Sequence, residues 1–288
     1  MARRRRVLVG VAAAAAISLI AAGAALGALT YTQYDYPLTD NDQMSDYSSC
    51  GTKLDPIGGG IYITGSGLGI EVNYTYPADS AVDPDKRPDG WEVGANSDGS
   101  GDQTLTDHLI CSDLPLSYPK VGRSLPLDSD RSARANCPGD RHVASGGVYI
   151  TDPNDLQREV VETYPVDGGD ADKRPDDGWV GRASNYGSAG DTKLQVFAVC
   201  SPHNFSYRFA TKRVGASTQV GKSVSCGKGD RVVGGGMEIT KPGDETESAT
   251  VAPFDGDDAD SKADDGWGAW ANNESSKARR MTTWAICL

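Results

Sequence analysis

The chain has 288 residues, and its 40 acidic residues outnumber its 28 lysines and arginines, which gives a formal net charge of −12. A surface this acidic repels nucleic acid and anionic lipid, and it suits a cation or a basic protein as a partner. Apolar residues make up 38% of the sequence and glycine occurs 35 times. This composition is lean but sufficient for a globular β protein with many turns.

The N-terminal segment has the pattern of an export signal. Four arginines precede an apolar, uncharged run from Val7 to about Leu29, and small residues lie near its end. We expect residues 1–28 to be a signal peptide that is cleaved to release a secreted protein, with a mature N-terminus between Ala25 and Tyr31. The run is also long enough to cross a membrane, so an uncleaved anchor with the rest of the chain outside is the alternative.

One unit of sequence occurs three times after this segment. Its first half reads "CGTKLDPIGGGIYIT" from Cys50, "CPGDRHVASGGVYIT" from Cys137 and "CGKGDRVVGGGMEIT" from Cys226. A tyrosine stands nineteen residues before each of these cysteines, at Tyr31, Tyr118 and Tyr207. The repeat therefore divides the mature chain into three units at about 31–117, 118–206 and 207–288, and so regular a period is typical of a repeat architecture. The glycines read as a bulge or a close backbone approach beside the cysteine.

The second half of each unit repeats as well. It contains a proline with an aspartate two residues later, then Asp-Gly-Trp, an asparagine five or six residues further on, and a closing strand that ends in cysteine. The tryptophans are Trp91, Trp179 and Trp267, and the asparagines are Asn96, Asn185 and Asn272. We expect each tryptophan to begin a strand and to pack its indole on the core of its own unit.

The six cysteines are an even number, which in an exported chain indicates disulfides. Six cysteines allow fifteen connectivities, but each unit contains one cysteine near its glycines and one at its end. The simplest pairing therefore repeats within units: Cys50 with Cys111, Cys137 with Cys200, and Cys226 with Cys287. Each bond closes a loop of about 60 residues and would stabilise its unit by roughly 4 kcal/mol in the chain-entropy model.

The local pattern is β throughout, because short alternating or β-branched runs are separated by glycine, proline or aspartate. We expect an all-β protein of three tandem disulfide-closed antiparallel units, with four or five short strands in each. Two assemblies remain open. The units can be separate beads on a string, or they can form a closed three-sided β-prism with one sheet per unit around a pseudo-threefold axis. The prism is slightly favoured.

Each unit carries an acidic loop directly before its Asp-Gly-Trp. The loops are "YPADSAVDPDKRPDGW", "YPVDGGDADKRPDDGW" and "APFDGDDADSKADDGW". Carboxylates crowded this closely repel one another unless they are solvated or bridged by a cation, and calcium takes six to eight oxygen ligands. The candidate calcium ligands are Asp79, Asp83, Asp85 and Asp89, then Asp167, Asp170, Asp172 and Asp177, and finally Asp255, Asp258, Asp260 and Asp265. The alternative is a set of solvated hairpin tips that serve solubility alone.

Enzyme chemistry is not favoured. The three histidines fall at different places in their units, and no catalytic serine elbow, zinc-binding helix or phosphate loop occurs. The sequence thus predicts a non-enzymatic binding or structural protein, secreted or held at the cell surface, with an unidentified extracellular ligand and no certain cofactor. A carbohydrate-binding, lectin-like protein that uses Trp270 or Tyr186 as a sugar platform is the second hypothesis. A secreted hydrolase that uses loop aspartates is the third.

The order of Cys, Gly-Gly-Gly (Ser-Gly-Gly in the second unit), Tyr-Pro, Gly-Trp, Asn and Cys resembles a repeat of little-characterised secreted bacterial proteins, chiefly from actinobacteria. The resemblance covers nearly the whole mature chain, although the third unit has Ala252 in place of the tyrosine. It implies export, β structure and disulfides, and it brings no catalytic residues. The expected threefold arrangement is more loosely similar to β-prism proteins, such as the vitelline membrane outer layer protein and jacalin-type lectins, a likeness of fold that implies no ligand.

Overall fold

The structure is a computed structural model of the chain. It describes residues 27–65, 67–80, 87–97, 101–151, 157–169, 172–186, 190–241, 245–256 and 260–288. All regular elements in these residues are β-strands, and no helix there is long and apolar enough to span a membrane. The expected signal peptide lies outside the described residues, apart from its last two positions.

Eighteen strands occur in the described residues, six in each unit. The first unit holds β1 (Leu29–Leu38), β2 (Asp42–Ser49), β3 (Asp55–Ile63), β4 (Ile70–Ala78), β5 (Gly90–Ser97) and β6 (Gln103–Ser112). The second holds β7 (Lys120–Leu125), β8 (Ser129–Asn136), β9 (His142–Ile150), β10 (Arg158–Val166), β11 (Gly178–Asn185) and β12 (Thr192–Ser201). The third holds β13 (Ser206–Val214), β14 (Thr218–Ser225), β15 (Val232–Thr240), β16 (Thr246–Phe254), β17 (Gly266–Asn273) and β18 (Arg279–Cys287). The expectation of four or five strands per unit was therefore too low.

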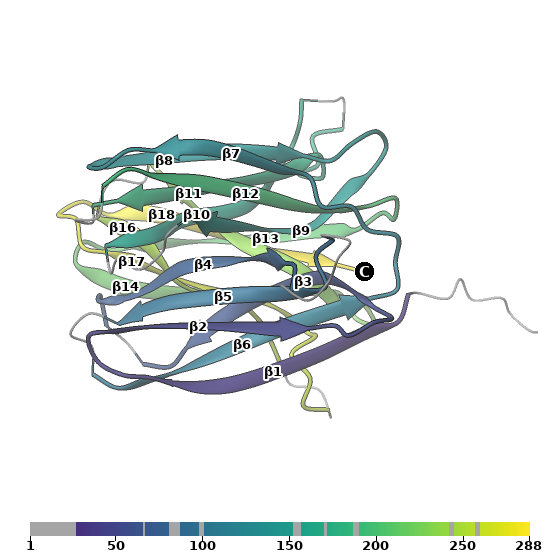
Figure 1. The fold of residues 1–288 in the computed structure, drawn as a ribbon, viewed down its shortest axis with the longest axis horizontal. Helices are drawn as coiled ribbons and strands as arrows, with labels where there is room; N and C mark the ends of the chain where they lie inside the picture. The colour runs from purple at the N-terminus through teal and green to yellow at the C-terminus, as the bar shows by residue number, and fades with distance from the viewer. Residues whose placement is uncertain are drawn as a thin grey trace, which may run out of the picture.

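The strands form three antiparallel six-stranded sheets, and each sheet is shared by two units. Sheet A has the order β1-β6-β3-β16-β17-β14, sheet B β2-β5-β4-β9-β12-β7, and sheet C β13-β18-β15-β10-β11-β8. Every unit thus places its first, third and sixth strands in one sheet and its second, fourth and fifth strands in another. The expectation of one sheet per unit is wrong. Figure 1 shows the strands running along the long axis of the molecule.

The third strand of one unit meets the fourth strand of another at the centre of each sheet. The aligned residues are Val148 with Thr75, Met237 with Thr163, and Ile61 with Val251. A glycine lies beside each meeting point because the backbones approach closely there. A Cβ on Gly147, for example, would lie 2.3 Å from the carbonyl oxygen of Thr75. The expected close backbone approach is therefore a contact between units.

The three sheets close around a pseudo-threefold axis. The three fourth strands, β4, β10 and β16, contact one another, and so do the three third strands, β3, β9 and β15. Because every unit shares a sheet with each of the other two, the units cannot be separate beads. The prism-like arrangement is confirmed, as an interlocked form in which two half-units build each face.

The tryptophans of the Asp-Gly-Trp triplets lie in the core, as predicted. Trp91, Trp179 and Trp267 are all buried, at 0%, 0% and 2% exposure. Each indole packs on a glycine of the third strand of its own unit: a Cβ on Gly59 would lie 2.4 Å from Cγ of Trp91. A bulky residue at that position would displace the indole, which explains why the repeat keeps glycine there.

The predicted disulfides are present: Cys50–Cys111, Cys137–Cys200 and Cys226–Cys287. Each joins the end of the second strand of a unit to the sixth strand of the same unit, and these strands belong to different sheets. A β-bulge interrupts the pairing of the third and sixth strands beside each bond, as at Pro56/Gly58. The disulfides therefore link neighbouring faces of the prism, and they indicate an oxidising, extracellular environment.

Candidate functional site

The three acidic loops lie at one end of the prism. Each connects the fourth strand of its unit to the fifth: β4 to β5, β10 to β11, and β16 to β17. The strands that they join are related by the pseudo-threefold axis, so the loops occupy equivalent positions. The disulfides lie at the same end, because the second strands end there and the sixth strands end there too. We call this the loop end.

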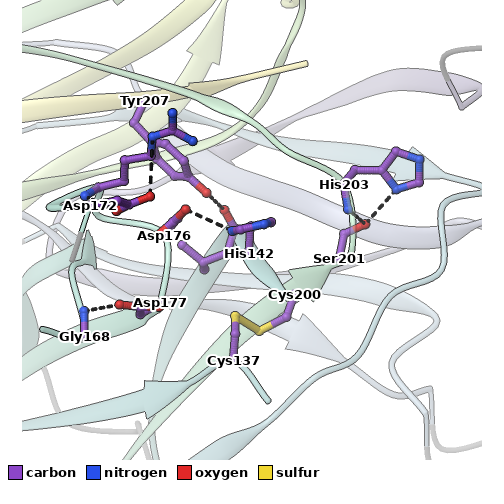
Figure 2. A network of polar contacts seen from close by, with 12 residues as sticks. Cys137, His142, Gly168, Asp172, Asp176, Asp177, Cys200, Ser201, His203 and Tyr207 are labelled. Atoms are coloured by element: carbon purple, nitrogen blue, oxygen red, sulfur yellow. Dashed lines mark hydrogen bonds and ion pairs between the residues drawn. A yellow bond between two sulfur atoms is a disulfide. The ribbon is translucent and has the colours of Figure 1, made fainter. Parts of the chain in front are cut away.

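The last aspartate of each predicted ligand set closes the neck of its loop. Asp265 Oδ2 accepts a hydrogen bond from the backbone N–H of Gly256 at 2.7 Å, and Asp89 Oδ1 accepts one from Ser80 at 2.8 Å. Asp177 accepts the equivalent bond from the N–H of Gly168 (Figure 2). These three carboxylates join the two described ends of each loop, which is a role the sequence did not indicate.

The other predicted ligands divide into two groups. Asp83, Asp85, Asp170 and Asp258 lie outside the described residues. Asp79, Asp172, Asp255 and Asp260 are exposed, and Asp167 is half-buried. Asp172 forms an ion pair with Arg174 at 3.6 Å, and Asp260 forms one with Lys262 at 2.7 Å. The described loop aspartates do not gather into a group of three that could hold one ion, and calcium binding by the complete loops stays a prediction.

A polar contact joins the base of the second loop to the strand beside it. The buried Asp176 lies 2.9 Å from Nδ1 of His142 at the start of β9, and burial raises the pKa of this carboxyl (Figure 2). The first unit has an ion pair in the corresponding region, between Asp55 at the start of β3 and Arg87 of the loop at 2.6 Å. These contacts hold the loops against the prism, so His142 has a structural role here.

The other two histidines take no part in the contact between His142 and Asp176. His108 is buried in β6, where burial lowers its pKa to about 4, and His203 lies between β12 and β13 beside Ser201. The three histidines thus occupy three different environments, in agreement with their unequal places in the repeat.

A second acidic cluster lies toward the opposite end, on the pseudo-threefold axis. Glu71, Glu159 and Glu247 are the second residues of β4, β10 and β16, and each offers a carboxylate oxygen within 4.8 Å of the other two. Glu159 and Glu247 are only 9% and 4% exposed. Burial raises the pKa of Glu71 to about 10 and that of Glu247 to about 9. We call these residues the glutamate ring.

Sequence reasoning missed the glutamate ring, although a signal was present. Each glutamate stands six residues before the repeated proline of its unit. The residue directly before that proline is Tyr76, Tyr164 or Ala252. A charged residue that recurs at the same place in all three copies of a predicted strand should have marked a shared site. The three repeated asparagines do not occupy equivalent positions. Asn96 and Asn272 pair with ring glutamates on the neighbouring strand, whereas Asn185 lies one residue after the position that pairs with Glu159.

A row of aromatic side chains crosses the outer face of sheet C. Phe209 is 61% exposed, and its ring centroid lies 4.9 Å from that of Trp284. Gly236 follows in register, and Tyr164 lies beside it. The platforms expected from the sequence differ from this row: Trp270 is half-buried against Tyr62, and Tyr186 is half-buried directly after β11.

Comparisons with known proteins add no function. No protein-family model and no curated protein sequence matches the chain. Among solved structures, the chain is weakly similar to two from studies titled "The Triple Jelly Roll Fold and Turret Assembly in an Archaeal Virus" and "Life in the extremes: atomic structure of Sulfolobus Turreted Icosahedral Virus". The identities are 10% and 11%, the alignments cover 91% of this chain and 89% or 90% of the others, and both TM-scores are 0.19. Similarity this low carries no argument about fold or function.

Proposed function

We propose that the protein is an extracellular, non-enzymatic binding protein that presents its three acidic loops to a cationic ligand. The observation that carries this proposal is the equivalence of the loop necks, in which Asp89, Asp177 and Asp265 accept the same backbone hydrogen bond. The necks hold the loops at one end of a rigid prism. Three equivalent sites on one body gain avidity for a ligand that can contact more than one of them.

The charge of the loop end favours a cation as the ligand. Exposed carboxylates such as Asp79, Asp172 and Asp260 stand on the loops, and the chain as a whole is acidic. A calcium ion would bind through carboxylate oxygens of one loop, whereas a basic protein surface would span several loops. Both ligands use the same chemistry, and stoichiometry separates them.

The experiment measures both ligands on one set of variants. Calcium bound per chain is measured by equilibrium dialysis, and a fluorescent oligolysine peptide is followed by anisotropy at low and high salt. Asp79→Asn, Asp172→Asn and Asp260→Asn neutralise the loops one at a time. We expect binding to fall stepwise, by one calcium ion per chain for each loop, or by a loss of peptide affinity with each substitution.

A matched control comes from the opposite end of the prism. Asp128→Asn removes one exposed charge in the turn between β7 and β8 and should leave binding unchanged. If neither ligand binds, or if the triple loop variant binds as the wild type does, the loops are solvated hairpin tips and the proposal is wrong.

The aromatic row favours a second candidate function, glycan binding on sheet C. Trp284 and Tyr164 lie on a flat sheet face on either side of Gly236, which has no side chain to block them, and aromatic rings stack on apolar sugar faces. A glycan array tests this hypothesis, with Trp284→Ala as the variant and Trp270→Ala as the control. Unchanged array signals in Trp284→Ala would reject the platform.

A further inference from the structure

The glutamate ring holds carboxylate atoms that have no hydrogen-bonding partner among the described residues. Oε2 of Glu71 and Oε1 of Glu247 are both buried without a partner. Glu247 is a β16 residue more than nine-tenths buried, and its carboxylate points into the ring on the axis. A buried polar atom left in this state costs free energy, and a positively charged partner for the ring oxygens would offset that cost.

Among the described residues, no cation forms an ion pair with the ring glutamates. Arg158 precedes Glu159 but lies on the other side of β10, where its guanidinium donates to Asn185 Oδ1 and to the carbonyl oxygen of Gly190, both at 3.0 Å. Glu274, which is another acidic residue, also lies near the ring. Three carboxylates therefore share one buried place.

We propose that the glutamate ring binds one hard metal cation of the calcium class on the pseudo-threefold axis. Oxygens arranged in a plane around calcium at its usual bond lengths lie about 4.0–4.5 Å apart, and the ring oxygens lie within 4.8 Å of one another. Three carboxylates carry up to six oxygens, which matches the lower end of calcium coordination. A lanthanide ion has the same preference for oxygen and provides a luminescent probe.

Polar groups around the ring would orient its ligands. Ser184 Oγ donates to Glu159 Oε1 at 3.0 Å. Asn272, which faces Glu247 across the sheet, donates its amide to the carbonyl oxygens of Leu68 and Ile70 at 2.9 and 2.7 Å. The side chain of Asn272 is thereby fixed beside the ring. Hydrogen bonds from the groups that surround metal ligands hold those ligands in place.

The position of the ring gives the ion a structural consequence. Each ligand belongs to a different unit, so one ion would join all three units where the fourth strands meet. Binding that requires three correctly placed units stabilises the closed prism over the unfolded chain. This site is separate from the acidic loops, because it lies toward the opposite end of the prism. It takes one ion per chain, whereas the three loops would take three.

The experiment counts ions on the intact protein. Wild type, the isosteric variant Glu71→Gln/Glu159→Gln/Glu247→Gln, and the control Glu238→Gln are dialysed to equilibrium against calcium, and bound metal is measured by mass spectrometry. Terbium luminescence follows the same site. We expect the ring variant to bind one ion fewer per chain than wild type and control, and to gain less in melting temperature from calcium than they do.

Two further variants separate this site from the loops. The single substitution Glu247→Gln guards against misfolding of the triple variant and should weaken terbium binding at least tenfold. The loop variant Asp79→Asn/Asp172→Asn/Asp260→Asn should retain the ring's ion. Equal metal content in wild type and in a folded ring variant would overturn the proposal, as would a wild type that binds neither calcium nor terbium. In either case the carboxyls hold protons instead of a metal.

Discussion

The hydroxyl of Tyr207 donates a hydrogen bond of 2.7 Å to the carbonyl oxygen of Val143, and this bond joins the third unit to the second (Figure 2). The equivalent Tyr118 donates to Pro56 in the first unit at 3.1 Å, and Tyr31 donates to Val232 in the third at 2.8 Å. The three bonds form a closed cycle. The tyrosine that marks the start of each unit in the sequence therefore ties that unit to a neighbour.

Loss of one of these hydroxyls should weaken the contact between two units. Tyr207→Phe removes the donor and leaves the Val143 carbonyl oxygen without it, so we expect a loss of about 1–2 kcal/mol in the free energy of unfolding. Chemical denaturation measures it. Tyr34→Phe is the control, because Tyr34 is 50% exposed and should change stability by less than about 0.5 kcal/mol. Equal effects of the two substitutions would contradict this role.

The central glycine of sheet B should not tolerate a methyl group. The Cβ of Gly147→Ala would lie 2.3 Å from the Thr75 carbonyl oxygen, a backbone atom of another unit. We expect a destabilisation of about 1–3 kcal/mol, read from the melting temperature. Gly122 on edge strand β7 has open space around its Cβ position, so Gly122→Ala should melt within a few degrees of wild type.

A hydroxyl added to the third unit should stabilise the protein. The indole N–H of Trp91 donates to Thr75 Oγ1 at 2.8 Å and that of Trp179 to Thr163 Oγ1 at 2.7 Å. The third unit has Val251 at the equivalent position, and Trp267 Nε1 is buried without a hydrogen-bond partner among the described residues. Val251→Thr supplies the acceptor, and we expect a gain of about 1 kcal/mol in the free energy of unfolding.

The reverse substitution is the control for that gain. Thr163→Val removes the acceptor of Trp179 and should cost about 1–2 kcal/mol. If Val251→Thr destabilises the protein while Thr163→Val has no effect, the buried indole N–H groups do not govern stability at these positions.

Stability should depend on pH through Glu162, which lies where the second and third units meet. Its carboxylate accepts a hydrogen bond from the N–H of Ile239 at 2.7 Å, and burial raises its pKa to about 7, while Arg182 opposes the rise and Glu238 adds to it. The folded state thus holds this proton more tightly than the unfolded state. The stabilisation is complete below pH 4.5, the ordinary pKa, and is lost as the pH rises through about 7.

The measurement compares two proteins across that range. The free energy of unfolding of wild type should fall by roughly 2–3 kcal/mol more between pH 4.5 and 7 than that of Glu162→Gln. Glu245→Gln tests the specificity of the effect, because Glu245 is exposed. Parallel pH profiles for wild type and Glu162→Gln would show that Glu162 titrates normally.

Each disulfide should contribute several kcal/mol. Cys137 and Cys200 close a loop with a sequence separation of 63, and Cys137→Ser/Cys200→Ser should reduce the free energy of unfolding by roughly 4 kcal/mol. Non-reducing peptide mapping checks the pairing in the same samples. A peptide that links Cys111 to Cys137 would contradict the pairing within units.

The sequence predicted the units, the disulfides and the buried tryptophans because each of these features recurs at a fixed place within one unit. It could not predict how the sheets are shared. Val148 pairs with Thr75 of another unit. The residue that corresponds to Thr75 in the unit of Val148 lies in a strand with the same β pattern. A repeat therefore gives no means of telling pairing within a unit from pairing between units.

The two candidate sites also differ in how far the sequence could predict them. The acidic loops were evident because their aspartates are close in sequence, although the neck role of Asp89, Asp177 and Asp265 depends on contacts that only the fold supplies. The glutamate ring was missed because its members lie in three different units. Only the pseudo-threefold axis brings Glu71, Glu159 and Glu247 together.

The most direct test of cation binding by this protein is anomalous diffraction from crystals grown with terbium or calcium. We predict one peak on the pseudo-threefold axis between Glu71, Glu159 and Glu247, and a bound cation at each of the three loops of the loop end. A map from well-ordered crystals without a peak at either place would contradict it.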